Sequence, residues 1–154
     1  MAQVNLTYNE IIGDFRTACT EHLGIKTFNT GTIDFLDASS QNVQFPYVYL
    51  RPVSSAGFSD GIRGLSFDLF SIDVPRLSDQ SPVTVLSNTE QFLYDLMAWF
   101  NYGPKQNVYR DLVNMVGLTP VNEAFNDRAF GWVASIQVNT PFMLDYCNYP
   151  TGSL

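Results

Sequence analysis

The feature that most constrains this fold is a segment near the C-terminal end in which apolar residues alternate with small or polar ones. The alternation is regular over residues 130–140, with Val133 as the one apolar residue on the polar side. Side chains of a strand point to its two faces in turn, so this pattern predicts a strand with one apolar face. That face carries Phe130, Trp132, Ala134, Ile136 and Val138. An apolar strand face needs a second layer to cover it.

Two amphipathic helices are predicted, and each begins with a recognisable capping sequence. The segment Thr7–Glu10 is a capping box, and apolar residues recur after it at helical spacing, which predicts a helix over residues 8–23. Ser81 and Pro82 have the residue types of an N-cap and of the first helical position. They predict a second helix over about residues 82–101, which carries the largest apolar face in the chain. These helices can cover the apolar strand face.

Further strands are predicted in the first half of the chain. Residues 45–51 and 65–74 are rich in β-branched and aromatic residues and are bounded by turn formers, which predicts two strands. Between them, Ser54–Gly64 contains three glycines and is interpreted as a long mobile loop at the tip of an antiparallel hairpin. A brief strand is also expected near residues 26–30.

Residues 105–125 complete the order of predicted elements, and this order predicts the fold class. Residues 105–117 fit a short helix and a strand equally well, and residues 118–125 are expected to hold a short strand. The order is then helix, strand pair, helix, strand pair. This order predicts one α+β domain over residues 1–154, in which two main helices pack on one face of a largely antiparallel sheet of about four strands.

The charge balance excludes some classes of partner. The chain has a net charge of −7 and 15% charged residues, against roughly 25% in most soluble domains. Eight scattered basic residues cannot neutralise enough phosphates for general nucleic-acid binding, and anionic membrane surfaces are disfavoured for the same reason. No apolar stretch approaches the roughly 20 residues that cross a bilayer. A neutral polar, aromatic-rich surface of this kind indicates assembly with other protein subunits.

Residues suited to catalysis or metal binding are scarce. The single histidine, His22, is expected near the end of the first helix, and the local sequence offers it neither a nucleophile nor an orienting carboxylate. Cys19, His22 and Cys147 could supply three metal ligands, but zinc sites usually show two close ligand pairs and here there is one. Cys19 is interpreted as a core residue and both cysteines as free thiols. We therefore expect no enzymatic activity, no metal and no cofactor.

The aromatic content exceeds what one core of this size needs. Aromatic residues beyond the core, beside neutral polar ones, are typical of interfaces between proteins. Some of these residues are therefore expected in interfaces, and the alternative is that they simply lie at the surface. The set is Tyr47, Tyr49, Phe58, Trp99, Tyr102, Tyr109, Tyr146 and Tyr149.

The C-terminal third carries a recognisable pattern. Residues 125–132 read Phe-Asn-Asp-Arg-Ala-Phe-Gly-Trp, and the alternating strand, a proline and a late cysteine follow. This pattern resembles one in small virion proteins of tailed bacteriophages, namely the tail terminator or tail-completion proteins of phages that infect Bacteroidota. The matching residues are Gly131, Trp132, Pro141 and Cys147. Asp127 and Arg128 stand where an Asn pair is more usual, and the order of predicted elements also fits the family.

The resemblance implies a ring-forming neck protein, commonly a hexamer, that is assembled in the host cytoplasm and becomes part of the virion. Such a ring would cap the head-proximal end of the tail tube and dock onto the head connector, while DNA passes through its lumen without specific binding. A ring requires two different, complementary faces on each subunit. The predicted loop is our candidate for reaching the tube or the connector. Its contact residues would be Phe58, Asp60, Ile62 and Arg63.

Two other functions remain open. A head-side connector or another tail subunit would share the neutral, aromatic surface. A small cytosolic ligand-binding or enzymatic α+β domain would instead show a deep apolar pocket with convergent polar groups. A ring assembly without such a pocket would favour the structural function.

Overall fold

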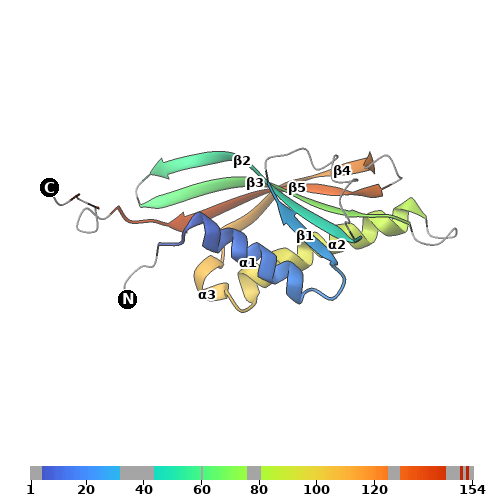
Figure 1. The fold of residues 1–154 in the computed structure, drawn as a ribbon, viewed down its shortest axis with the longest axis horizontal. Coiled ribbons are helices and arrows are strands. Elements are labelled where there is room, and N and C mark those ends of the chain that lie inside the picture. The colour runs from blue at the N-terminus through green and yellow to red at the C-terminus, as the bar shows by residue number, and fades with distance from the viewer. Residues whose placement is uncertain are drawn as a thin grey trace.

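The computed structural model describes residues 5–31, 44–59, 61–75, 81–124, 129–144, 150 and 152. In this part of the chain, a layer of helices packs against one sheet, which is an α+β arrangement (Figure 1). The elements in chain order are α1 (Tyr8–Glu21), β1 (Thr27–Thr30), β2 (Tyr47–Ser59), β3 (Ile62–Asp73), α2 (Pro82–Tyr102), α3 (Gln106–Tyr109), β4 (Val113–Ala124) and β5 (Ala129–Pro141).

The described strands form a single mixed sheet in the order β1-β2-β3-β5-β4. β1 pairs with β2 in parallel, whereas the β2–β3, β3–β5 and β4–β5 pairs are antiparallel. The predicted α+β class with a largely antiparallel sheet is therefore confirmed. The expected number of about four strands was not exact, because the brief strand expected near residues 26–30 joins the sheet as a parallel edge.

Both main helices lie on the same face of the sheet, as predicted (Figure 1). α1 packs over β1, and α2 packs over β3, β5 and β4. The core between the two layers is dense in aromatic rings. The ring of Phe15 lies 4.5 Å from that of Phe100 and 5.9 Å from that of Phe67, measured between centroids, and all three side chains are buried.

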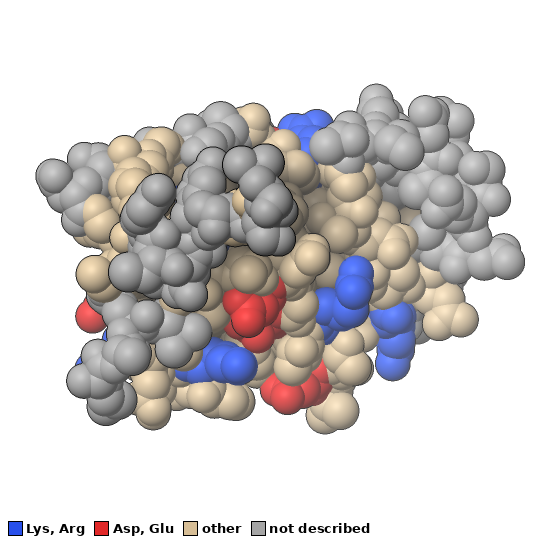
Figure 2. Space-filling model, turned by 60° about the vertical axis from the view of Figure 1, so that its left-hand side comes forward, with Lys and Arg blue, Asp and Glu red and all other residues tan. Residues whose placement is uncertain are grey.

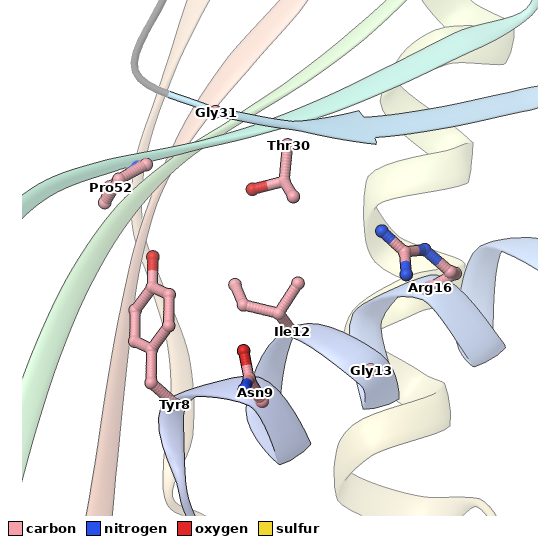
Figure 3. Close-up of a pocket in the computed structure, with 8 residues that line it drawn as sticks. All are labelled: Tyr8, Asn9, Ile12, Gly13, Arg16, Thr30, Gly31 and Pro52. Atoms are coloured by element: carbon pink, nitrogen blue, oxygen red, sulfur yellow. The ribbon is translucent and has the colours of Figure 1, made fainter.

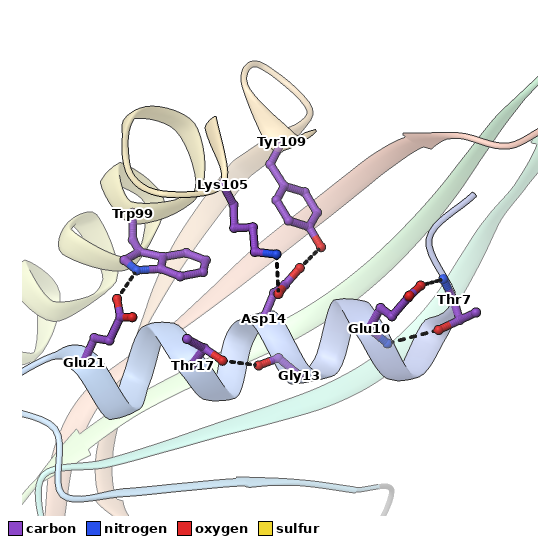
Figure 4. Close-up of polar contacts among 9 residues, drawn as sticks. All are labelled: Thr7, Glu10, Gly13, Asp14, Thr17, Glu21, Trp99, Lys105 and Tyr109. Carbon is purple, nitrogen blue, oxygen red and sulfur yellow. Dashed lines mark hydrogen bonds and ion pairs between the residues drawn. The ribbon is translucent and has the colours of Figure 1, made fainter. Parts of the chain in front are cut away.

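The capping box predicted at the start of α1 is present (Figure 4). The Glu10 amide donates to the Thr7 hydroxyl at 3.2 Å, and the Thr7 amide donates to the Glu10 carboxylate at 2.6 Å. The end of α1 differs from the prediction, because His22 has an extended backbone and the helix stops at Glu21. Leu23, the last residue of the predicted helix, therefore lies outside α1 and is 93% exposed.

The second helix begins as predicted and the undecided stretch divides into two elements. The hydroxyl of Ser81 accepts a hydrogen bond from the Thr84 amide at 3.3 Å, and Pro82 occupies the first helical position. Residues 105–117 form the single turn α3 and then the first part of β4. β4 is consequently longer than the strand expected over residues 118–125.

The interpretation of Ser54–Gly64 as a long mobile loop was wrong. β2 continues to Ser59 and β3 begins at Ile62, so most of this segment is paired strand. Two of the glycines allow irregular backbone within the hairpin. Gly57 has φ 92° beside a register shift in β2, and Gly61 has φ 79° at the turn between β2 and β3. Only glycine adopts such angles without strain. Asp60 lies outside the described residues.

The sheet carries a second apolar cluster on the face that α1 and α2 do not cover. Val48 and Leu50 of β2 point into the helix-covered core, so Tyr47 and Tyr49 point to the opposite face. There they pack with Phe70, Ile72 and Ala129. The aromatic residues beyond one core are thus partly accounted for by a second one. Of that set, Tyr47, Tyr49 and Tyr109 are buried, whereas Phe58 and Tyr102 are exposed.

Charged side chains are sparse on the surface. On the face that Figure 2 shows, Lys, Arg, Asp and Glu side chains lie singly among neutral ones, and neither sign of charge gathers into a patch. Among the described helices, none is both long enough and apolar enough to cross a membrane.

Candidate interaction surface

The tip of the β2–β3 hairpin carries exposed apolar side chains together with the segment that follows β5. Figure 1 shows that the hairpin tip, the end of β5 and the start of α1 lie at the same end of the molecule. The exposed fractions are 46% for Phe58, 52% for Ile62, 57% for Met143 and 76% for Leu144. We call these four residues the tip surface. Apolar side chains that cluster in this way at a surface usually contact another molecule.

The segment after β5 is fixed across the hairpin tip. The Phe142 amide donates to the Gly61 carbonyl oxygen at 2.7 Å. The Phe142 ring also packs edge-on against the Phe58 ring, with the centroids 6.1 Å apart. The guanidinium of Arg63 lies over the Phe142 ring, 4.9 Å from its centroid. The apolar residues of the tip surface therefore have a rigid base.

The residues before α1 are tied to the same base. The side-chain amide of Asn5 donates to the Met143 carbonyl oxygen at 2.7 Å and accepts from the Met143 amide at 2.9 Å. Arg63 donates to the Leu6 carbonyl oxygen at 2.6 Å. Three segments that are distant in the sequence are thus held together at this end. A pre-organised surface loses little conformational entropy when a partner binds.

Arg63 places a positive charge beneath the tip surface. It pairs in the strand register with Thr140 of β5. The Nε of Arg63 and the hydroxyl of Thr140 are buried without a hydrogen-bond partner within the described structure. In the same set of residues, no carboxylate forms an ion pair with Arg63. The tip surface therefore suits a partner that brings apolar side chains and a hydrogen-bond acceptor or an acidic group.

The sequence-predicted contact residues only partly coincide with this surface. Phe58 and Ile62 are exposed at the tip, whereas Arg63 points beneath it and Asp60 lies outside the described residues. Met143 and Leu144 were missed. A signal for them existed, because three consecutive apolar residues, 142–144, follow the proline that ends β5. Such a run outside a predicted element favours an exposed apolar patch.

The residues that carry the family resemblance do not form one site. Gly131 lies in β5 against β3, where a Cβ would collide with the Ser71 carbonyl oxygen. Trp132 donates from its indole nitrogen to the Leu86 carbonyl oxygen of α2 at 2.8 Å. Pro141 instead lies at the opposite end of β5, beside the hairpin tip. The roles of Gly131 and Trp132 are structural. Cys147 and the turn over residues 125–128 lie outside the described residues.

His22 has the carboxylate partner that the sequence could not show. Its Nε2 lies 2.9 Å from an Asp95 oxygen, and its Nδ1 accepts the Gly24 amide at 3.0 Å. Because Nδ1 accepts, the ring proton lies on Nε2 and is donated to Asp95. Burial alone would raise the pKa of Asp95, but hydrogen bonds from His22 and Gln91 outweigh it and lower that pKa. Nε2 thus joins the end of α1 to α2, and Nδ1 fixes the turn that follows α1.

The cysteine in α1 is a core residue, as predicted. Cys19 is buried and free, and burial raises the pKa of its thiol to about 12. The thiolate is the reactive and metal-binding form of cysteine, so this side chain is unreactive in the folded state. No cluster of potential metal ligands occurs in the parts of the chain that the structure describes.

Polar side chains on α1 hold it against the neighbouring helices (Figure 4). The Tyr109 hydroxyl donates to Asp14 at 2.6 Å, and the Lys105 ammonium lies 3.8 Å from the same carboxylate. Burial and the bond to Asp14 raise the pKa of Tyr109. The Trp99 indole donates to Glu21 at 2.7 Å. These contacts link α1 to α2 and α3.

A groove runs between α1 and the edge of the sheet. Its volume is about 560 Å³, and it is open to solvent. Figure 3 shows Tyr8, Ile12 and Arg16 reaching from α1 toward the strands, with Thr30 pointing back from β1. Of the described residues that line it, Arg16 alone is charged. The groove is an extended surface rather than an enclosed ligand pocket.

No protein-family model matches the chain, and no curated protein matches it either.

Proposed function

We propose that this protein is a structural virion protein that forms a ring at the head-proximal end of a phage tail. It caps the tail tube and joins it to the head connector, and DNA passes through the lumen. The observation that carries the proposal is the tip surface. It presents four exposed apolar side chains on a rigid base at one end of the subunit. In the proposed ring, this end of the subunit faces the partner above or below the plane of the ring.

The charge distribution supports a conduit rather than a DNA-binding protein. The net charge is −7. On the face shown in Figure 2, basic side chains do not gather into the stripe that follows a phosphate backbone. A lumen lined by neutral or acidic residues would let DNA pass without retaining it, because like charges repel. The sparse surface charge also means that few ions must be desolvated when subunits meet.

The contacts of His22 favour a structural function over an enzymatic one. Catalysis by the His22–Asp95 pair would need a free ring nitrogen facing a nucleophile or a substrate. Nδ1 instead accepts the Gly24 amide. The pair serves to fix the two helices, which a ring subunit requires for a constant shape.

The proposal is tested by placing a charge on the tip surface. Ile62→Asp should leave the domain folded and yield unjoined heads and tails in place of complete particles. Val53→Asp is the matched control, because Val53 is also an exposed apolar residue of the hairpin but lies away from the tip. The measurements are the infectious titre and negative-stain microscopy of lysates from a phage that carries each variant. Normal particles from Ile62→Asp would contradict the role of the tip surface.

Locating the protein separates the two structural alternatives. Immunogold labelling of isolated tails should mark their head-proximal end. Label on DNA-filled heads that lack tails would instead favour a head-side connector.

A further inference from the structure

A second surface of the molecule has a composition unusual for solvent-exposed helix. α2 contains no Lys or Arg, and its only charged residues are Glu90 and Asp95. Exposed helix faces usually carry charges of both signs. An exposed helix face with so few charges indicates a surface that another protein covers.

The contacts of α2 with α1 define which side of the helix is left over. Three residues of α2 lie on the side that faces α1. The Phe92 ring packs against the His22 ring, Asp95 accepts from the Nε2 of His22, and the Trp99 indole donates to Glu21. At 3.6 residues per turn, positions 83, 87, 90, 94 and 98 share one stripe of α2 that is turned away from both α1 and the buried face of the helix. We call this the outer flank of α2. Its residues are Val83, Ser87, Glu90, Tyr94 and Ala98.

The outer flank is apolar at its ends and carries one charge in the middle. Val83 is 73% exposed, and Tyr94 and Ala98 are also exposed. Glu90 accepts a hydrogen bond from the Tyr94 hydroxyl at 2.7 Å, which leaves its second oxygen for another donor. The described basic residues form no ion pair with Glu90.

The groove between α1 and the edge of the sheet, which we call the α1–β1 groove, carries a positive charge, opposite to that of Glu90. The Arg16 guanidinium lies 5.8 Å from the centroid of the Phe28 ring and, among the described side chains, has no carboxylate partner. The other described residues that line the groove are uncharged, and they include Ile12, Thr30 and Pro52. Among the described residues, the groove thus carries one cation without an ion pair, and the outer flank carries one carboxylate without an ion pair.

The two surfaces lie at opposite edges of the sheet. α1 and the groove are at the β1 edge, whereas α2 packs over β3, β5 and the β4 edge (Figure 1). Two different surfaces on opposite sides of one subunit join copies head to tail, which closes into a ring when the rotation between neighbours allows it.

We propose that the outer flank of α2 in one copy docks in the α1–β1 groove of the next copy, with Glu90 facing Arg16. The occupant of the groove is therefore a second copy of this chain. The inference rests on the proposed ring function and names the lateral interface of that ring. The tip surface remains free in this arrangement for contacts along the ring axis.

The test is a charge swap in the full-length chain. Sedimentation velocity from micromolar to millimolar concentration should show self-association of the wild type. Arg16→Glu or Glu90→Arg alone should weaken it by about tenfold or more, because like charges then face each other. The double variant Arg16→Glu/Glu90→Arg should restore most of the affinity, since the pair is re-formed with reversed polarity.

Two control variants separate this effect from others. Arg110→Glu makes the same change in charge at an exposed residue outside both surfaces and should leave self-association unchanged. Tyr94→Phe keeps the ring but removes the bond to Glu90, and it should weaken association much less than Glu90→Arg. Circular dichroism and urea unfolding show whether each variant is folded.

Three results would overturn the interface. They are a wild type that stays monomeric at millimolar concentration, single reversals that associate normally, and a double variant that is not rescued. These results are distinct from failure of the proposed function. If Arg16→Glu supports normal tail completion while Ile62→Asp blocks it, the neck function stands and the lateral interface lies elsewhere.

Discussion

The helix-covered core and the tip surface both consist of apolar and aromatic side chains, but they are completed in different ways. In the core, Phe15, Phe67 and Phe100 contact one another and are buried within the chain. At the tip, Phe58 and Phe142 contact each other, yet Phe58 and Ile62 remain about half exposed. The comparison teaches that rigidity and burial are separable. The tip is fixed by hydrogen bonds from Phe142 and Asn5, yet its apolar side chains stay about half or more exposed.

The largest expected effect comes from removing an aromatic ring from the core. Phe100→Ala should lower the free energy of unfolding by about 3–5 kcal/mol, because it leaves a cavity among rings that cannot move to fill it. The matched change at the tip, Phe58→Ala, should cost less than about 1 kcal/mol, since that ring is half exposed. Urea denaturation followed by circular dichroism measures both. Equal losses would mean that the tip is part of the folding core.

Two glycine substitutions compare a backbone position that is closely packed with one that has open space around it. Gly131→Ala should destabilise the protein by about 1–3 kcal/mol or more, because its Cβ would meet the Ser71 carbonyl and the strands would have to separate. Gly13→Ala has no atom within 4 Å of the added Cβ and should stabilise α1, by up to about 1 kcal/mol. Thermal unfolding reports both directions. If Gly131→Ala left the free energy of unfolding unchanged, the backbones of β5 and β3 would have to lie farther apart at this position than the structure shows.

A smaller effect is expected from the polar contacts that hold α1. Tyr109→Phe removes the donor to Asp14, and the carboxylate then has only Lys105 as a partner. The loss should be about 1–2 kcal/mol by urea unfolding. Tyr102→Phe is the control, because that side chain is exposed, and it should change nothing measurable. A loss in the control would indicate that any tyrosine hydroxyl contributes.

The smallest expected effect is a dependence of stability on pH through Asp95. Its pKa is lowered in the folded protein, so its stabilising contribution is complete above its unfolded value and is lost as the pH falls through the folded value. Asp95→Asn should therefore reduce the decline in stability on acidification below about pH 4. The Asp95 side chain is 40% exposed, so the difference should be modest. Urea midpoints of the two proteins at pH 3 and pH 6, compared pairwise, provide the check.

Much of the fold could be predicted because the signals were local. The capping box at Thr7 and the Ser81-Pro82 pair fix where helices begin, through contacts within one turn. The alternation over residues 130–140 fixes the faces of β5, because a strand has only two. Together, these signals also imply that helices cover one face of the sheet.

What the sequence could not show depends on contacts between distant residues. Glycines at positive φ occur in bulges and tight turns as well as in loops, so Gly57 and Gly61 do not reveal a continuous hairpin. The base of the tip surface joins Gly61 to Phe142 through a backbone hydrogen bond, and the His22–Asp95 pair spans 73 residues. The second apolar cluster was missed for the same reason, since one sequence pattern cannot say how many faces of a sheet are covered.

The contacts of the two tryptophans have a practical consequence for spectroscopy. Both indole nitrogens donate hydrogen bonds to a helix: Trp99 of α2 donates to Glu21 of α1, and Trp132 of β5 donates to the Leu86 carbonyl oxygen of α2. The chain has no other tryptophan. Its intrinsic fluorescence should therefore report the undocking of the helices from the sheet. Binding at the hairpin tip should leave that emission unchanged, so a partner has to be followed with a probe placed there.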